Sequence, residues 1–479
     1  MSTLARPSTL VFYGVGAISP TIKNNLFVFF LFYYYNQVLG LEAYLVSLAL
    51  ALSLVVDAIT DPLLGYVSDH THSRLGRRHP YIYFSLVPSP ICYYLLMSLE
   101  YTSTQASLFA QLFLMATLLR LAWTFFNVPR QALGAELTKD YHQRNTLSAI
   151  STFFGWFGGA VMWYMTTAVF LGESYDNKQG YRDLAFWGAA VILVTGTIFA
   201  LGTHREIPNL EPPRQKRPIQ MRAILQEIKE TLSHRSWLML FVAGVITSIH
   251  AGVVVGLGIY FNSYFWEWKP SDVAIFAITN LVGSLIISSL ASRLARNWDK
   301  KQLAVGLYII VITLGQIPLI LRLSDLWLGT SILPENGPIY SALWWVLISH
   351  SFITSTIGTL AGILVGSMTA DIVEDSQATT GRRSEGLFFA GPHLIEKCVT
   401  GLGYIVKGII LTAVGFSVAA TGLEKVDAIE RMAAVVIVLG IVLPALSLYM
   451  VSKYEITESS HESKLQDLGY KEQETEPFS

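Results

Sequence analysis

The chain has 479 residues, of which 52% are hydrophobic and only 14% are charged. Soluble globular proteins carry about 25% charged residues, so this composition excludes an ordinary soluble enzyme. The net charge of -1 gives no electrostatic reason to expect nucleic-acid binding. Apolar stretches of about 20 residues or more recur along the whole chain, and each is long enough to cross a hydrocarbon core about 30 Å thick.

Twelve membrane-spanning helices are expected from these stretches, so the predicted fold class is an all-α membrane protein. The expected spans are residues 12–36, 43–68, 81–99, 105–128, 146–171, 183–203, 237–263, 271–293, 302–322, 340–369, 385–414 and 432–452. A polar segment rich in proline separates the first six spans from the last six. The predicted organisation is an N-terminal six-helix half over 1–203, a cytoplasmic central loop over 204–236, a C-terminal six-helix half over 237–452 and a cytoplasmic tail over 453–479.

Positive charge is unevenly distributed among the loops. Arg74, Arg77 and Arg78 follow the second span, whereas the loops after the first and third spans contain no lysine or arginine. Lys and Arg are enriched in cytoplasmic loops. We therefore expect a multi-pass protein of a bacterial inner (plasma) membrane with both termini in the cytoplasm. Two parallel six-helix halves around a midplane site are the major facilitator architecture, which is the fold that we predict.

The second span contains two aspartates one helical turn apart, Asp57 and Asp61. Spacing of i and i+4 places both carboxylates on one face of the helix. Counted from Asp69 at the cytoplasmic end, Asp61 lies about 12 Å deep and Asp57 about 18 Å deep. A charge near the bilayer centre costs about 3 kcal/mol. The pair is tolerable if it lines a wet cavity, binds a cation or shares a proton.

A cation-coupling site is the functional interpretation of this pair. Carboxylate and hydroxyl oxygens suit Na+, and a proton can occupy the same carboxylates. Thr60 and Thr124 are candidates to complete the shell of ligands. The alternative is that basic residues neutralise the aspartates for packing alone. Na+ and H+ both stay open as the coupling ion, and no other cofactor is expected.

The eleventh span carries a second set of polar residues. Lys397 lies about 18 Å from the expected start of that helix, so it needs a partner, and the carboxylates of the second span are the candidates. His393, one turn earlier, is interpreted either as a packing residue or as a substrate contact. Lys407 lies nearer the far end and is expected to extend to the membrane interface.

Charged residues gather at the expected cytoplasmic ends of the helices. They are either solvated helix ends or ion pairs between the halves that close the inward side in one state. The predicted gating residues are Asp69, Arg74, Arg77, Glu136, Arg144, Asp371, Arg383 and Glu385.

Sequence motifs of other protein classes are missing from the chain. It contains no Gly-rich nucleotide loop ending in Gly-Lys-Ser or Gly-Lys-Thr, so ATP as the energy source is unsupported. It also contains no zinc-protease spacing and no nucleophile elbow. We therefore do not expect an enzyme.

Several short motifs stand out along the chain. They are Tyr33-Tyr34-Tyr35, Asp57-Ala58-Ile59-Thr60-Asp61-Pro62, Ser73-Arg74-Leu75-Gly76-Arg77, Val128-Pro129 and Gly381-Arg382-Arg383. With them the chain resembles the glycoside–pentoside–hexuronide:cation symporters, the melibiose permease group. The resemblance implies symport with sodium, lithium or a proton by alternating access. The cation ligands that it implies are Asp57, Thr60, Asp61 and Thr124.

The sugar-binding residues of that group match this chain less well. The resemblance places Thr21 at a family aspartate of the first span, Asn127 at a second aspartate and Gln131 at a stacking tryptophan. The predicted substrate contacts are Thr21, Asn127, Gln131, His393 and Lys397. Arg130 and His393 are candidates to meet an anionic group such as a uronate. Trp123, Trp156 and Tyr260 are candidates to stack on a sugar ring, with lipid-facing or core packing as the alternative for each.

Three functional interpretations stay open. The first is a cation-coupled importer of a glycoside, pentoside, hexuronide or related oligosaccharide, which works as a monomer in the lipid bilayer without a nucleic-acid partner. The second is a cation-coupled transporter of lysophospholipids, because some relatives with the Asp-Ala-Ile-Thr-Asp-Pro sequence carry lipids. The third is a non-transporting membrane receptor on the same fold.

Overall fold

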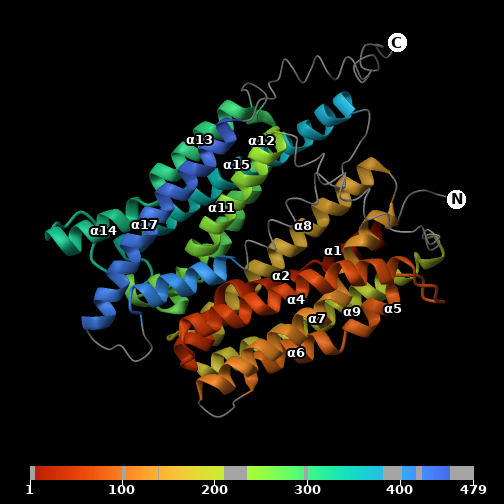
Figure 1. The fold of residues 1–479 in the computed structure, drawn as a ribbon, viewed down its shortest axis with the longest axis horizontal. Helices are drawn as coiled ribbons and strands as arrows, with labels where there is room; N and C mark the ends of the chain where they lie inside the picture. The colour runs from red at the N-terminus through yellow and green to blue at the C-terminus, as the bar shows by residue number, and fades with distance from the viewer. Residues whose placement is uncertain are drawn as a thin grey trace. The chain divides into compact units, whose positions relative to one another are not determined.

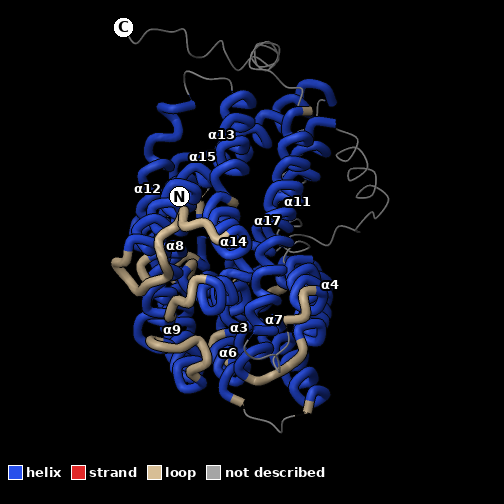
Figure 2. Tube along the Cα trace, turned by 90° about the vertical axis from the view of Figure 1, so that its left-hand side faces the viewer, coloured by secondary structure: helices blue, strands red, loops and turns tan. Residues whose placement is uncertain are grey.

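The computed structural model describes residues 6–99, 104–138, 140–209, 235–295, 300–380, 402–416 and 423–453. Every regular element within these ranges is a helix (Figure 2). The N-terminal elements are α1 (Pro7–Val15), α2 (Ile18–Asn25), η1 (Leu26–Phe30), α3 (Leu31–Tyr33), η2 (Tyr34–Val38), α4 (Ala43–Asp69), α5 (His79–Ser85), α6 (Pro88–Ser98), α7 (Gln105–Leu137), α8 (Tyr141–Tyr164), η3 (Met165–Leu171), α9 (Lys178–His204) and η4 (Ile207–Asn209). The later elements are α11 (Arg235–Tyr260), η5 (Phe261–Phe265), η6 (Pro270–Val273), α12 (Phe276–Ala295), α13 (Lys300–Gly315), α14 (Ile317–Leu328), α15 (Ala342–Thr380) and α17 (Leu423–Ser452).

The all-α prediction is confirmed. Ten helical stretches in the described residues are long and apolar enough to cross a membrane, and a shorter apolar helix covers Leu402–Ala413. The third expected span is present as two helices, α5 and α6, which meet just before Pro88. A proline lacks the N–H that an uninterrupted helix requires, which explains the break. Most of the first part of the eleventh expected span, residues 381–401, lies outside the described residues.

The chain divides into two compact units, and each is described by itself. The first unit contains Met1–Arg217, Val255–Leu281 and Tyr404–Ile429. The second contains Pro218–Val254, Val282–Gly403 and Glu430–Ser479. The predicted central loop falls almost entirely in residues that the structure does not describe, so the predicted halves and tail stay predictions.

In the first unit, α4 packs along α7, α6 along α9, and α1 and α2 along α8 (Figure 1). Glycines allow the close approach of α8. A Cβ added at Gly14 of α1 would lie 2.4 Å from Ile150 Cγ2, and one at Gly159 of α8 would lie 2.7 Å from Thr21 Cγ2. Small residues at helix contacts are the usual way in which membrane helices gain packing energy, since lipid tails are as apolar as the side chains.

The second unit has an apolar core of its own, formed by α11, α13, α15 and α17. Its fully buried members are Trp237, Leu240, Ala243, Ala304, Leu364, Met368 and Val451. A hydrogen bond of 2.7 Å joins the hydroxyls of Thr247 and Ser447, and Ser447 also donates to the Ala243 carbonyl at 3.1 Å. These bonds tie α11 to α17 where no water is available to satisfy the hydroxyls.

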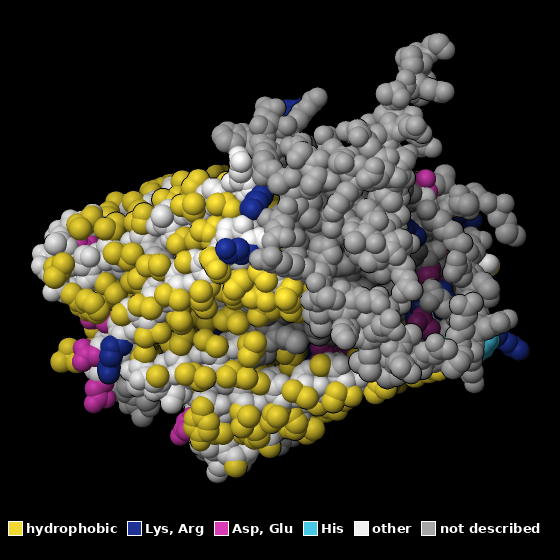
Figure 3. Space-filling view, turned by 45° about the horizontal axis from the view of Figure 1, so that its top comes forward, with side chains coloured by type: hydrophobic (Ala, Val, Ile, Leu, Met, Phe, Trp, Pro, Cys, Tyr) yellow, Lys and Arg dark blue, Asp and Glu magenta, His cyan; other side chains and the backbone are white. Residues whose placement is uncertain are grey.

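The outer surface carries the composition expected of a protein in lipid. Figure 3 shows a face on which apolar side chains dominate between charged residues at the rims. On α4 the exposed residues include Val55, Ile59 and Leu63, each more than half exposed. Exposed apolar surface of this extent is unsuited to water and is matched to a bilayer. The fold therefore agrees with a multi-pass membrane protein.

Two glycine-to-alanine substitutions, one at the helix contact and one control elsewhere, test the packing of α1 on α8. We expect Gly14→Ala to lower the free energy of unfolding by about 1–3 kcal/mol, because the new methyl group overlaps Ile150. The control is Gly306→Ala in α13, where an added Cβ meets no atom within 4 Å. The control should leave the thermal midpoint unchanged or raise it through better helix propensity. Melting of both variants in detergent, followed by a thiol-reactive dye, decides the matter, and equal midpoints would contradict the close packing.

Candidate functional site

Helix α4 has two chemically different faces. Val55, Ile59 and Leu63 are exposed at a spacing of four residues, whereas Asp57 is only 8% exposed. At 100° per residue, Asp57 and Asp61 lie roughly opposite that apolar row. Hence the apolar row faces outward and the two carboxylates face the neighbouring helix α7, with which α4 packs.

A threonine of α7 lies between the two carboxylates. The Thr124 hydroxyl donates to Asp61 Oδ1 at 2.7 Å and lies 3.5 Å from Asp57 Oδ1. The longer distance is at the limit of a hydrogen bond, and one hydroxyl proton serves one acceptor at a time. We therefore regard the Asp61 contact as the bond and Asp57 as a close neighbour. The predicted ligands Asp57, Asp61 and Thr124 thus meet at one buried place.

The fourth predicted ligand, Thr60, is arranged differently. Its hydroxyl donates to the backbone carbonyl of Asp57, one turn back, at 3.3 Å. This is the usual local bond of a threonine inside a helix. Its place in the cation shell stays a prediction.

Arg120 is the basic partner of the acidic pair. Its Nη1 lies 3.7 Å from Asp57 Oδ2, and its Nε donates to Ser53 Oγ at 3.1 Å. The guanidinium also lies over the ring of Phe27, 4.7 Å from the centroid. Arg120 is 3% exposed, so water does not screen this charge pair. The sequence interpretation overlooked this residue, although an arginine inside an apolar span is itself a costly feature that demands a partner.

The partner proposed from sequence, Lys397, lies outside the described residues, as does His393. A lysine of the first span is found here instead. Lys23 is 8% exposed, and its Nζ lies 5.0 Å from the centroid of the same Phe27 ring. Two acidic and two basic side chains of the first unit therefore cluster around α2, α4 and α7.

A cavity of about 680 Å³ opens beside this cluster in the same unit. Its wall includes Thr21 and Trp156, two residues singled out from the sequence. The full wall is Ala17, Pro20, Thr21, Asn25, Phe29, Arg130, Ser151, Thr152, Gly155, Trp156, Gly159, Ala160, Trp163, Phe276, Ala277, Asn280 and Leu281. This volume is within the range of about 300–1,000 Å³ that is typical of small-molecule sites.

Two other predicted substrate residues and two of the predicted stacking residues are not part of this wall. Asn127 and Gln131 are on α7 but are not part of the wall. Trp123 is buried against Phe126, and the Tyr260 hydroxyl donates to Asn36 Oδ1 at 2.8 Å. For Trp123 and Tyr260 the packing alternative fits these contacts, while Asn127 and Gln131 stay predictions.

Arg130 is the charged residue of the cavity wall. Its Nη2 donates to Ser151 Oγ at 3.0 Å, and its guanidinium lies over the rings of Tyr13 and Phe199, at 5.0 and 6.0 Å. Its Nε has no hydrogen-bond partner in the described residues, and no carboxylate there lies within ion-pair distance. A desolvated cation–π contact contributes about 2 kcal/mol. The desolvation penalty of a buried ion is several kcal/mol, so the rings compensate this charge only in part.

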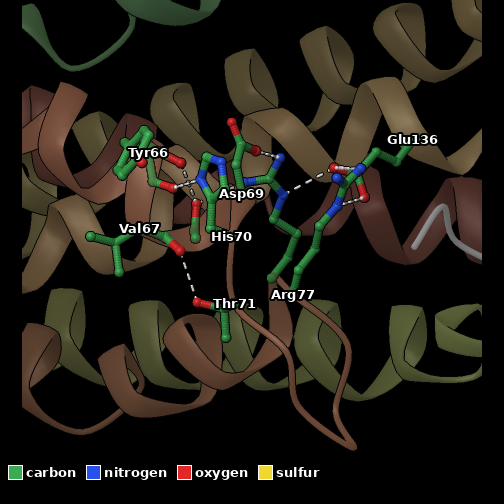
Figure 4. A network of polar contacts seen from close by, with 10 residues as sticks. Tyr66, Val67, Asp69, His70, Thr71, Arg77 and Glu136 are labelled. Carbon is green, nitrogen blue, oxygen red and sulfur yellow. Dashed lines mark hydrogen bonds and ion pairs between the residues drawn. The ribbon is translucent and has the colours of Figure 1, made fainter. Parts of the chain in front are cut away.

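Charged residues also meet at the expected cytoplasmic ends of α4 and α7 (Figure 4). Glu136 accepts two bonds from Arg77, at 3.0 and 3.2 Å, and a third from Arg78 Nε at 2.9 Å. Arg78 also pairs with Asp69 and donates to Ser68. Both arginines are 5% exposed. This network ties α4 to α7 within one unit.

The predicted gating set is thus brought together in part. Asp69, Arg77 and Glu136 join through Arg78, whereas Arg74 is exposed and Arg144 Nε donates to the Thr138 carbonyl at 3.1 Å. The side chain of Asp371 and all of Arg383 and Glu385 lie outside the described residues. Ion pairs between the halves stay a prediction.

Lys407 differs from its expected exposure. It is 1% exposed, its Nζ donates to the Gly256 carbonyl at 2.7 Å and lies 4.1 Å from the centroid of the Phe32 ring. The expectation that it extends to the membrane interface is wrong. The neighbouring helices enclose it, and counting depth along one helix does not reveal neighbours about 150 residues away in the chain.

Comparison with known proteins identifies the family. The model of the MFS/sugar transport protein family matches residues 12–458. The chain belongs to this family. Among its relatives are the putative glycoside/cation symporter YagG of Escherichia coli (strain K12), 24% identical with 94% of this chain and 92% of the relative covered, and the isoprimeverose transporter of Lactiplantibacillus pentosus, 24% identical with 92% and 88% covered. A crystal structure of the nucleoside transporter NupG superposes with a TM-score of 0.61 at 14% identity, covering 92% of this chain and 99% of that one.

Three predictions are confirmed by this membership. The resemblance to the glycoside–pentoside–hexuronide:cation symporters is correct, the fold is that of the major facilitator superfamily, and the protein is a membrane transporter and not an enzyme.

The contribution of the Arg77, Arg78 and Glu136 network to stability can be tested. Glu136→Gln should lower the free energy of unfolding by about 3–5 kcal/mol, because it leaves the buried Arg77 and Arg78 without their shared carboxylate. Arg74→Gln is the control, since Arg74 is exposed, and it should change the stability by less than about 0.5 kcal/mol. Thermal melting in the same detergent measures both. Similar midpoints for the two variants would show that the network adds no stability.

Proposed function

We propose that this protein is a secondary active symporter that couples Na+ or H+ to the uptake of a glycoside, pentoside, hexuronide or related oligosaccharide. Its place is the bacterial inner membrane, with both termini in the cytoplasm and with a monomer as the working unit. One observation supports this most directly. Two carboxylates and a hydroxyl from different helices, Asp57, Asp61 and Thr124, meet within an apolar helix pair, where Asp57 and Thr124 are buried and Asp61 is partly buried.

Cation binding requires a small rearrangement at this place. Thr124 Oγ1 also lies 3.0 Å from the backbone carbonyl of Arg120. When the hydroxyl proton turns to that carbonyl, the lone pairs of Oγ1 are directed to a cation held by Asp61. A proton can instead bind Asp61 itself and remove the charge. In both cases the ion neutralises a carboxylate that is costly inside the membrane.

The contact between Arg120 and Asp57 bears on which carboxylate the entering ion binds. Arg120 lies beside Asp57, and we propose that the entering cation binds at Asp61. The energy available for coupling is the difference between the free energies of the site with and without the bound ion. Alternating access then moves the ion-bound site between the two sides of the membrane.

Two prolines lie close to the site, one in each of the helices that hold it. Pro62 follows Asp61 inside α4, and Pro129 follows Thr124 by five residues inside α7. Each removes one helical hydrogen bond, which lowers the resistance of the helix to bending. Both helices that hold the site are therefore weakened close to it.

The symport proposal is tested by uptake into proteoliposomes. Labelled glycosides and pentosides should accumulate under an inward Na+ or H+ gradient, and Asp57→Asn and Asp61→Asn should each abolish the stimulation by the gradient. Ser289→Ala, on the exposed surface of α12, is the control and should transport normally. Accumulation of lysophospholipid but of no sugar would contradict the proposed substrate. Normal stimulation in either aspartate variant would contradict the proposed site.

The two threonines separate the ligands of the site. Thr124→Val should weaken cation binding by about 10–100-fold, because it removes the hydroxyl that bonds to Asp61 and lies close to Asp57. Thr60→Val is the matched control and should bind the ion nearly as well as the wild type, since its hydroxyl serves its own helix. The shift of the melting temperature on exchanging choline chloride for NaCl, and on lowering the pH, measures binding without any sugar. Equal losses in both variants would restore Thr60 to the ligand shell.

A further inference from the structure

We propose that Arg130 and Ser151 form an anion subsite in the cavity, which binds the carboxylate or sulfonate of an acidic sugar. The inference rests on the proposed function, because it concerns the substrate of the same transporter. It goes further by assigning the class of substrate and by naming the residue that selects it.

The guanidinium of Arg130 is buried without a counter-charge in the described part of the chain. Tyr13 and Phe199 hold its faces and Ser151 accepts from Nη2, but Nε has no partner. Arg120, on the same helix, has Asp57 beside it. Arg130 and Ser151 both line the cavity, so an anion there lies next to the guanidinium and to the hydroxyl that it holds. Guanidinium groups bind carboxylates and similar anions by charge-assisted hydrogen bonds.

The rest of the wall fits a sugar ring. Trp163 Nε1 donates to the Val273 carbonyl at 3.3 Å, which fixes the indole. The indole also packs against the Phe29 ring, with 4.9 Å between the ring centroids. Trp156 is half exposed in the same wall. Indole rings provide flat apolar surfaces for the faces of a sugar.

Polar groups of the wall suit sugar hydroxyls. They come from the amides of Asn25 and Asn280 and the hydroxyls of Thr21 and Thr152. The wall combines amides, hydroxyls and indoles with the guanidinium of Arg130. This combination favours an acidic sugar over a phospholipid, because an acyl chain forms no hydrogen bonds with the polar groups of the wall.

The subsite and the cation site share one helix. Thr124 and Arg130 are six residues apart in α7, which is about 9 Å along the axis, and Pro129 lies between them. Thr124 faces α4, whereas Arg130 faces α1 and α8. An acidic sugar at Arg130 therefore contacts the same helix as the coupling ion, from another side.

The experiment compares two sugars that differ by one charge. Methyl β-D-glucuronide and methyl β-D-glucoside share a ring and differ only at C6, and titration calorimetry on the purified full chain gives the affinity for each. We expect the wild type to prefer the acid by about tenfold or more, as hydrogen bonds to charged groups warrant. Arg130→Gln should remove this preference and keep the neutral glucoside, while Arg130→Lys should keep part of it. Arg205→Gln, an exposed arginine after α9, is the control and should preserve the wild-type ratio.

The outcomes separate the two proposals. Equal affinities for both sugars in the wild type, or equal losses for both sugars in Arg130→Gln and Arg130→Lys, would overturn the anion subsite, because a merely structural arginine affects the two alike. Gradient-driven uptake of the neutral glucoside in that case leaves the symport proposal standing. Binding of lysophosphatidylcholine micelles with no binding of either sugar would overturn both.

Discussion

Every charge inside the membrane-spanning part of this protein needs compensation, and this need organises the helices of the first unit. Asp57 has Arg120, Asp61 has Thr124, and Arg77 and Arg78 have Glu136. All of these contacts join α4 or the loop after it to α7. Because an isolated charge costs several kcal/mol in this environment, the contacts fix the register of the two helices at two depths, which apolar packing alone specifies weakly.

The same need distinguishes two arginines of α7. The carboxylate of Asp57 lies beside Arg120 and compensates its charge. Arg130 is equally buried but has only rings and one hydroxyl among the described residues. Two residues of the same type, ten positions apart on one helix, are thus in opposite electrostatic situations. On the proposals made above, the first stabilises the site for the ion, and the second binds the anionic group of the substrate.

Sequence patterns predicted what depends on a single helix. The spacing of Asp57 and Asp61 predicted that both lie on the face of α4 opposite its exposed apolar row. Within the described residues, hydropathy predicted the helical spans, of which the third is broken before Pro88. Thr124 was a candidate ligand from its hydroxyl alone, and the family resemblance pointed to the same residue. Arg120 was missed because its partner is more than sixty positions away, and nothing in the local pattern states which acidic residue faces it.

The substrate wall shows the same limit at finer scale. Matching to the family pointed to Asn127 and Gln131, whereas Arg130 lies in the wall and those two do not. Successive residues of a helix point 100° apart, so a shift by one position changes the face completely. When both faces of a helix are apolar, as in this membrane helix, hydropathy gives no sign of which one lines a cavity.

On the proposed mechanism, coupling between ion and sugar follows from how α7 is held. The hydrogen bond from Thr124 to Asp61 ties α7 to α4. An ion that takes over Asp61 releases that bond, and the remaining ties are the Arg120 pair above and the Glu136 network below. An acidic sugar that binds Arg130 pulls on the opposite side of the same helix, next to Pro129. On the proposed mechanism each ligand changes the compensation of a charge on α7, so each alters the free energy at which the other binds, and this mutual effect is what symport requires.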